Sequence, residues 1–228
     1  MKAARNVKVV VPGGGEVSAL LQLPGDADCL LVLGHGAGAG MTHPFMEKIA
    51  AEFATARVGT LRYQFSYMEQ RRRVPDSQSL LTVTVAAAVK TAGHLAPGLP
   101  LFAGGKSMGG RMTSLAASER LLDGIRGIVF FGFPLHPPKR PGVKRAEHLK
   151  SVAMPMLFLQ GTRDELADLT LLRPICDEPG SRATLHIIDG ADHSFHMLKR
   201  SGRTDAEVLT ELAATAAAWM KMQQSPAA

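Results

Sequence analysis

The sequence is poor in cysteine, in aromatic residues and in long apolar runs. Its 228 residues include two cysteines, one tryptophan and two tyrosines, and aromatic residues make up 5%. Cys29 and Cys176 have no metal-ligand spacing and are too few for a small disulfide framework. No apolar run reaches the ~20 residues of a membrane span, and the first residues lack the apolar stretch of a signal peptide. We therefore expect a cytoplasmic location, no membrane partner and no metal.

The composition is that of a folded, slightly basic domain. Apolar residues make up 46% and charged residues 20%, which argues against disorder. A chain of this size buries roughly 70% of its surface, enough for a core. Without a repeat or linker in the pattern, we expect a single domain spanning residues 1–228. The net charge of +6 comes from basic residues that are scattered or not interleaved with aromatics, so we expect no nucleic-acid partner.

Strand patterns alternate with helix patterns after an initial hairpin. Residues 7–11 and 17–23 flank a turn of one proline and three glycines. Thr204 with Glu207 predicts a capping box at the last helix. This order predicts an α/β fold with a mostly parallel central sheet, an antiparallel N-terminal hairpin and helices on both faces. The expected strands are residues 30–33, 58–63, 101–104, 125–131, 155–160 and 183–188, and the expected helices are 43–56 capped by Thr42, 77–95 capped by Asp76 or Ser77, 108–121 and 204–223.

The sequence Gly105-Lys106-Ser107-Met108-Gly109 fits the pattern G-x-S-x-G. Chance alone gives roughly 0.1 such matches in a chain of this composition, so the context decides. The motif stands between an expected strand and an expected helix, which is the setting of a nucleophile elbow. Small flanking residues leave room for the sharp turn that exposes the serine hydroxyl. We predict that Ser107 is a nucleophile.

Two nucleotide-binding patterns compete for the same glycines. A phosphate-binding loop ending in Gly-Lys-Ser needs a glycine where this chain has Pro100, so that interpretation fails. Gly34, Gly36 and Ala39 fit a dinucleotide fingerprint, but Arg62 stands where an acidic residue should close the next strand. Nucleotide binding is therefore the weaker interpretation, and we expect no cofactor.

An activated serine needs a histidine base that a carboxylate orients. In a strand-turn-helix setting of this kind the acid and then the histidine follow the serine, each after a strand. Asp164 comes directly after one expected strand and His193 shortly after the next. We predict these two as acid and base, with Glu165, Asp189 and Asp192 as alternative acids and His196 as the alternative base.

The oxyanion hole is expected to use two backbone N–H groups. One belongs to Met108, the residue after the nucleophile, at the positive end of the following helix. The other comes from the glycine-rich loop after strand 30–33, where we favour the N–H of Ala37.

The segments HGAGAG, GKSMGG, QGTRD and GADHSF follow one another in the order of the α/β-hydrolase superfamily, which the whole chain resembles. It is most similar to the small dienelactone-hydrolase-like branch. The segments RYQFSYMEQRRRVPD and FFGFPLHPPKRPG resemble the hydrolase-like domain of an NSL chromatin-complex subunit and its bacterial counterparts. The resemblance implies an α/β-hydrolase fold without a cap domain, because residues 134–154 are too few to form one.

The nucleophile at position 107 is serine, whereas dienelactone hydrolases use cysteine, which points to ester chemistry. We expect hydrolysis of a small or soluble carboxylic ester or thioester through an acyl-enzyme on Ser107. Acyl transfer and peptide hydrolysis stay open, as does a non-catalytic interaction domain that retains the fold. Arg71, Arg72 and Arg73 would either attract an anionic substrate or form a solvated loop, and Lys106 would either bias the charge near Ser107 or point into packing. The pattern predicts no oligomeric state.

Overall fold

The hairpin forms as the glycine turn predicts. β1 (Arg5–Val11) runs antiparallel to β2 (Gly15–Gln22), and Val11 pairs with Gly15 across the turn. Gly13 and Gly15 have φ values of 73° and 76°, which glycine adopts without strain. Alternate side chains of both strands are buried, so one face of the hairpin packs on the core.

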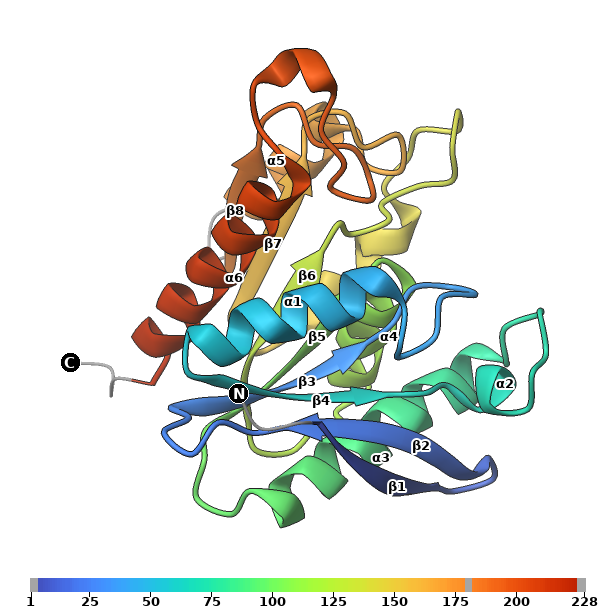
Figure 1. Ribbon diagram of the computed structural model, residues 1–228. Helices are drawn as coiled ribbons and strands as arrows, with labels where there is room; N and C mark the ends of the chain where they lie inside the picture. Colours follow the sequence, from blue (N-terminus) through green and yellow to red (C-terminus); the bar gives the residue numbers. More distant parts are fainter. Residues whose placement is uncertain (1–3, 179–181, 225–228) are drawn as a thin grey trace.

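The hairpin forms one end of an eight-stranded sheet with the order β1-β2-β4-β3-β5-β6-β7-β8 (Figure 1). β2 pairs antiparallel with β4, and all pairings from β4 to β8 are parallel. The carboxyl ends of the parallel strands therefore meet at one edge of the sheet, which we call the carboxyl edge. The parallel strands are β3 (Cys29–Gly34), β4 (Val58–Tyr63), β5 (Leu101–Lys106), β6 (Ile125–Phe131), β7 (Met156–Gly161) and β8 (Ala183–Ile188).

Helices cover both faces of the sheet (Figure 1). In β3, Leu31 and Leu33 pack into one apolar cluster with α1 and α6, whereas Leu30 and Val32 pack into another with α3 and α4. This alternation explains why the strand is a continuous apolar run, since both of its faces are buried. The helices are α1 (Pro44–Thr55), α3 (Gln78–Leu95), α4 (Met108–Ser118) and α6 (Asp205–Met222), with α2 (Ser66–Glu69) and α5 (Leu169–Asp177) in connecting segments.

The predicted fold is confirmed. The predicted elements differ from the structure at their ends, and the short helices α2 and α5 come in addition to them. Ser77 caps α3, and Thr204 with Glu207 forms both bonds of the capping box. The predicted cap of α1 is wrong by one residue: Nδ1 of His43, not Thr42, accepts the N–H of Phe45 at 3.2 Å. β5 extends two residues beyond its predicted end, and α4 stops three residues earlier than predicted.

The segment between β6 and β7 forms no cap domain. Residues 132–155 are described throughout, and their single regular element is the 3-10 helix η1 (Lys144–Ser151). The carboxyl edge therefore carries no helical cap from this insertion point, as the segment length predicts.

The computed structural model describes residues 4–178 and 182–224. Within these two ranges, no helix combines the length and the hydropathy needed to cross a membrane. In the same ranges, no three His, Cys, Asp or Glu side chains gather closely enough to hold a metal ion.

Candidate active site

Ser107 occupies a strained turn between β5 and α4. Its φ of 51° and ψ of −114° are unusual for a residue with a side chain. Its N–H donates to the carbonyl of Phe131 at 3.1 Å, which ties the turn to the end of β6. A Cβ on Gly105 or on Gly109 would stand 2.4 or 2.3 Å from the carbonyl oxygen of Gly34. The glycines on both sides of the serine are therefore required by the close approach of β3, β5 and α4.

The structure brings Ser107, His193 and Asp164 into one chain of hydrogen bonds at the carboxyl edge. Nε2 of His193 lies 2.9 Å from Oγ of Ser107, and Nδ1 lies 2.7 Å from Oδ2 of Asp164. The Asp164 side chain is fully buried, and the His193 side chain is 24% exposed. The loops after β5, β7 and β8 supply one residue each, so the parallel topology creates the cluster.

The surroundings of Asp164 determine which nitrogen of His193 carries a proton. Oδ1 accepts the N–H of Leu166 at 2.8 Å, and Oδ2 accepts Nε2–H of Gln160. The Gln160 amide has one orientation because its Oε1 accepts the N–H of Phe133 at 2.9 Å. An acceptor-only carboxylate requires the proton on Nδ1 of His193, which leaves Nε2 free to accept the Ser107 hydroxyl.

Gln160 is a site residue that the motifs of the sequence analysis do not identify. It is the penultimate residue of β7, is fully buried and bridges the loop after β6 to Asp164. A single glutamine in an otherwise apolar strand, four residues before an expected acid, is the signal that would have found it.

The alternative base, His196, is engaged elsewhere. Its Nδ1 lies 2.9 Å from Oδ2 of Asp205, and the side chain is 60% exposed. This hydrogen bond raises the pKa of His196 above its ordinary value. Asp192, one of the alternative acids, accepts the N–H groups of Ser194 and His196 at 2.8 and 2.9 Å. It stabilises the turn that carries His193.

The other two alternative acids also lie apart from the cluster. Glu165 is exposed. Oδ1 of Asp189 accepts the hydroxyl of Thr162 at 3.1 Å, which links the loops after β7 and β8. The three predicted residues are therefore the ones that the structure joins.

The glycine-rich loop after β3 lies beside Ser107. A Cβ on Gly36 would be 3.8 Å from the Cβ of Ser107. The N–H of Gly38 is occupied, because it donates to the hydroxyl of Tyr67 at 2.9 Å. Ala37 is exposed. Within residues 4–178 and 182–224, no hydrogen bond uses the N–H of Ala37 or of Met108, so both remain able to donate to a ligand.

His35 holds this loop in place as a neutral ring. Its Nε2 accepts the N–H of Phe65 at 3.2 Å, so the proton is on Nδ1, which donates to the carbonyl of Gly36 at 2.7 Å. Burial lowers the pKa of His35 to about 4. The ring is fully buried and packs edge-on against Phe65.

A neutral buried histidine makes stability depend on pH. Between pH 6.5 and 4 the unfolded chain binds the His35 proton and the folded chain does not, so the free energy of unfolding falls as the pH drops. We expect His35 to account for a loss of about 2 kcal/mol between pH 7 and pH 5. Urea unfolding at both pH values should show this loss reduced in His35→Gln and unchanged in the control His94→Gln, whose histidine is exposed. An equal pH dependence in all three proteins would contradict the assignment.

The three consecutive arginines form an exposed turn after α2. The guanidinium of Arg72 pairs with Asp76 and donates to Oε1 of Gln70 at 2.9 Å. Asp76 also accepts the N–H of Tyr67 at 2.8 Å. Arg72 therefore stabilises the segment that carries Tyr67.

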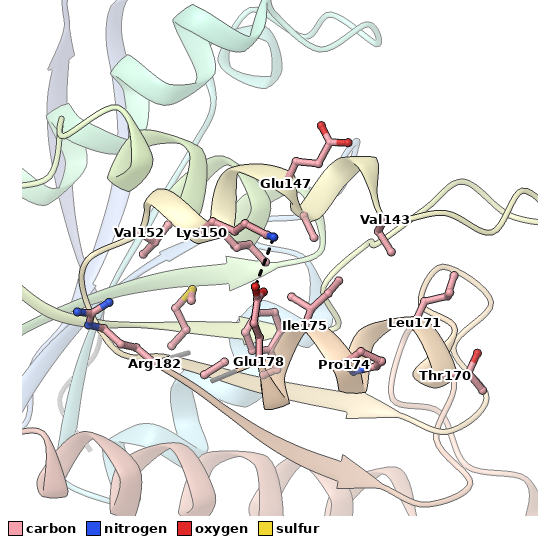
Figure 2. Close-up of a pocket in the computed structure, with 15 residues that line it drawn as sticks. Val143, Glu147, Lys150, Val152, Thr170, Leu171, Pro174, Ile175, Glu178 and Arg182 are labelled. Carbon is pink, nitrogen blue, oxygen red and sulfur yellow. Dashed lines mark hydrogen bonds and ion pairs between the residues drawn. The ribbon is translucent and has the colours of Figure 1, made fainter. Parts of the chain in front are cut away.

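A pocket of about 570 Å³ lies between η1 and α5 (Figure 2), and none of the residues that line it belongs to the Ser107 cluster. Its lining is mostly apolar and includes Phe158 and Ile175. An ion pair of 3.5 Å joins Lys150 to Glu178 between the two helices. The pocket lies beside the first half of β7, whereas Asp164 follows the other end of that strand. It is therefore not the space in front of Ser107.

The chain belongs to the alpha/beta hydrolase family, whose domain model matches residues 27–221. A dienelactone hydrolase from Anabaena variabilis is 21% identical, with a TM-score of 0.73 over 97% of this chain and 99% of that one. A serine hydrolase without a lid from Xanthomonas campestris is 17% identical, with a TM-score of 0.73 over 96% of both chains. Est1E from Butyrivibrio proteoclasticus is 17% identical, with a TM-score of 0.70 over 99% and 100%. The expected likeness to lidless α/β-hydrolases is confirmed at the level of the fold.

Proposed function

We propose that this protein is a serine hydrolase that cleaves small or soluble carboxylic esters or thioesters through an acyl-enzyme on Ser107. The observation that carries the proposal is the continuous hydrogen-bond chain from Asp164 through His193 to Ser107. Acyl transfer to water needs a nucleophile, a base and a carboxylate that orients the base, and the three residues contact one another in that order.

The reaction proceeds in two steps, acylation of Ser107 and hydrolysis of the acyl-enzyme. Oγ of Ser107 attacks the substrate carbonyl while its proton passes to Nε2 of His193, and that proton then goes to the departing alcohol or thiol. A water molecule next gives a proton to Nε2 and attacks the acyl carbon, which releases the carboxylic acid and returns the hydrogen to Ser107. Asp164 stays ionised and stabilises the imidazolium of each step.

The oxyanion of each tetrahedral intermediate is assigned to the N–H groups of Met108 and Ala37. Met108 is the first residue of α4, where the helix leaves its N–H groups unpaired and its dipole is positive. The bond between Gly38 and Tyr67, together with His35, supports the loop that carries Ala37. The proposed hole is thus held by groups outside the reaction, as preorganised stabilisation requires.

The preference for small or soluble substrates is inferred from the short segment between β6 and β7. Its 3-10 helix η1 packs against α4 and builds no cap over the carboxyl edge. Without such a cap, the site offers little apolar enclosure for a long acyl chain. The lidless serine hydrolase from Xanthomonas campestris has the same fold, which is in keeping with this inference.

A fluorophosphonate probe tests the proposal because it reacts with an activated serine. We expect intact-mass analysis to show one adduct on the wild-type protein and none on Ser107→Ala, with peptide mapping placing the adduct on Ser107. An unrelated exposed serine, replaced in Ser79→Ala, should leave labelling unchanged. Labelling that persists in Ser107→Ala, or no adduct on a folded wild-type protein, would contradict the proposal, and the second result would favour a non-catalytic interaction domain.

A further inference from the structure

Lys106 is the residue before Ser107, and its side chain points inward and contacts the main chain of the candidate base, His193. Its Nζ donates to the carbonyl oxygen of His193 at 2.5 Å. A Cβ on Gly132 would stand 3.1 Å from this Nζ, 3.4 Å from Oδ2 of Asp164 and 3.4 Å from Nδ1 of His193. The ammonium, the carboxylate and the imidazole thus surround one point, and Lys106 lies behind the hydrogen-bond chain.

Two aromatic rings complete the environment of the ammonium. Nζ lies 6.0 Å from the ring centroid of Phe45 and 5.5 Å from that of Phe195, and the two rings stack at 5.9 Å. Both distances are within the range of cation–π attraction. Phe45 belongs to α1, and Phe195 belongs to the loop that carries His193, so the ammonium connects three separate parts of the chain.

The loop that carries His193 needs such support. Phe195 has a φ of 64°, a left-handed value that is strained for an aromatic residue. Its N–H donates to the carbonyl of Asp192 at 2.9 Å, which closes a tight turn directly after His193. The bond from Lys106 holds the turn at the residue whose ring must stay between Asp164 and Ser107.

The charge of Lys106 is close enough to affect the imidazole. The carboxylates of Asp164 and Asp192 face the ammonium and attract it, but burial dominates and lowers the pKa of Lys106 to about 8. The side chain therefore remains charged at neutral pH. A positive charge beside an imidazole opposes its protonation.

We propose that Lys106 is a positioning residue for the reaction of Ser107: its ammonium anchors the main chain of His193, and its positive charge lies beside the imidazole that accepts the proton of Ser107. This inference rests on the proposed function. Lys106 has no contact with substrate in this role. The sequence left two alternatives open for its side chain, and the proposal combines them: the side chain points inward, and its charge lies near the base of Ser107.

The test compares pH profiles of kcat/KM for a soluble nitrophenyl ester in the wild type and in Lys106→Met, Lys106→Gln and Lys106→Arg. The methionine removes both bond and charge, the glutamine retains a donor, and the arginine retains the charge. In Lys106→Met we expect kcat to fall about 10- to 100-fold with KM within about twofold, and the acid limb to move up by about one pH unit. Lys106→Gln should show the same shift of the limb with a smaller fall in kcat.

Lys106→Arg should keep the acid limb of the wild type, and the control Lys90→Met, whose lysine is exposed, should change nothing. An unchanged acid limb in both neutral variants would overturn the inference. If Lys106→Met and Lys106→Gln both fail to fold while Lys106→Arg folds, the role of Lys106 is structural only, and this result would also overturn the inference. Activity retained by Ser107→Ala would instead refute the proposed function itself, so the two failures are distinguishable.

Discussion

Ser107→Ala is expected to lower kcat for a soluble ester by about 10⁴- to 10⁶-fold, and adding His193→Ala is expected to lower it no further. The physical reason is the single hydrogen bond of 2.9 Å between Nε2 and Oγ, through which both side chains serve one proton transfer. Once the nucleophile is gone, the base has no proton to remove. The measurement is kcat for the wild type, both single variants and the double variant.

The fold should survive these changes, because alanine retains the Cβ of serine in the strained turn at position 107. Unfolding in urea, with a free energy within about 1 kcal/mol of the wild type for Ser107→Ala, is the control. His186→Ala removes a histidine that pairs with Glu211 at 2.8 Å outside the site, and should keep full activity. Additive losses in the double variant would mean that Ser107 and His193 do not act as one unit.

Most of the fold follows from local patterns. The bounds of β4, β6 and β8 are the predicted ones. β4 and most of β6 are buried, as expected for strands in a sheet covered by helices. The capping box of α6 is likewise predictable from Thr204 and Glu207 alone. The cluster of Ser107, His193 and Asp164 follows from one further step, the meeting of carboxyl ends in a parallel sheet.

The short elements escape prediction for a different reason. α2 has four residues, too few for a helical periodicity, and α5 contains Pro174 within its nine residues. Their positions depend on tertiary contacts, such as the bond from Tyr67 to Gly38 and the burial of Leu172. Nothing in the local sequence encodes those contacts.

The short motifs also do not identify the supporting residues of the site. Gln160, Tyr67 and Lys106 act through bonds to segments 27, 29 and 87 residues away. Motifs describe residues that are close in sequence, so they identify Ser107 and not the groups that hold its partners. The inward direction of the Lys106 side chain likewise becomes apparent only from the positions of Gly132 and Phe195, which are distant in sequence.

Asp164→Asn is expected to lower kcat by about 10⁴-fold. The reason is that the asparagine NH₂ is a hydrogen-bond donor, and every group that contacts the Asp164 carboxylate is also a donor. Oδ1 meets the N–H of Leu166, and Oδ2 meets Nε2–H of Gln160 and Nδ1–H of His193. An amide NH₂ at the Oδ1 position would face the N–H of Leu166. At the Oδ2 position it would face Nε2–H of Gln160 and Nδ1–H of His193, and the imidazole relieves the second clash by moving its proton to Nε2. That tautomer cannot accept the proton of Ser107.

The same substitution should reduce the free energy of unfolding by about 1–3 kcal/mol, since a buried donor loses its partner. Kinetics and urea unfolding of Asp164→Asn, Asp192→Asn and Asp189→Asn separate the two effects. Asp189 is exposed and contacts Thr162, so its variant should keep kcat. Asp192→Asn should alter kcat far less than Asp164→Asn, because its Oδ1 accepts two backbone N–H groups and does not contact the imidazole of His193. A large loss of kcat in Asp192→Asn, with activity retained in Asp164→Asn, would assign the role of the acid to Asp192. The carboxylate that sets the tautomer of His193 is the one whose replacement by an amide must stop the reaction.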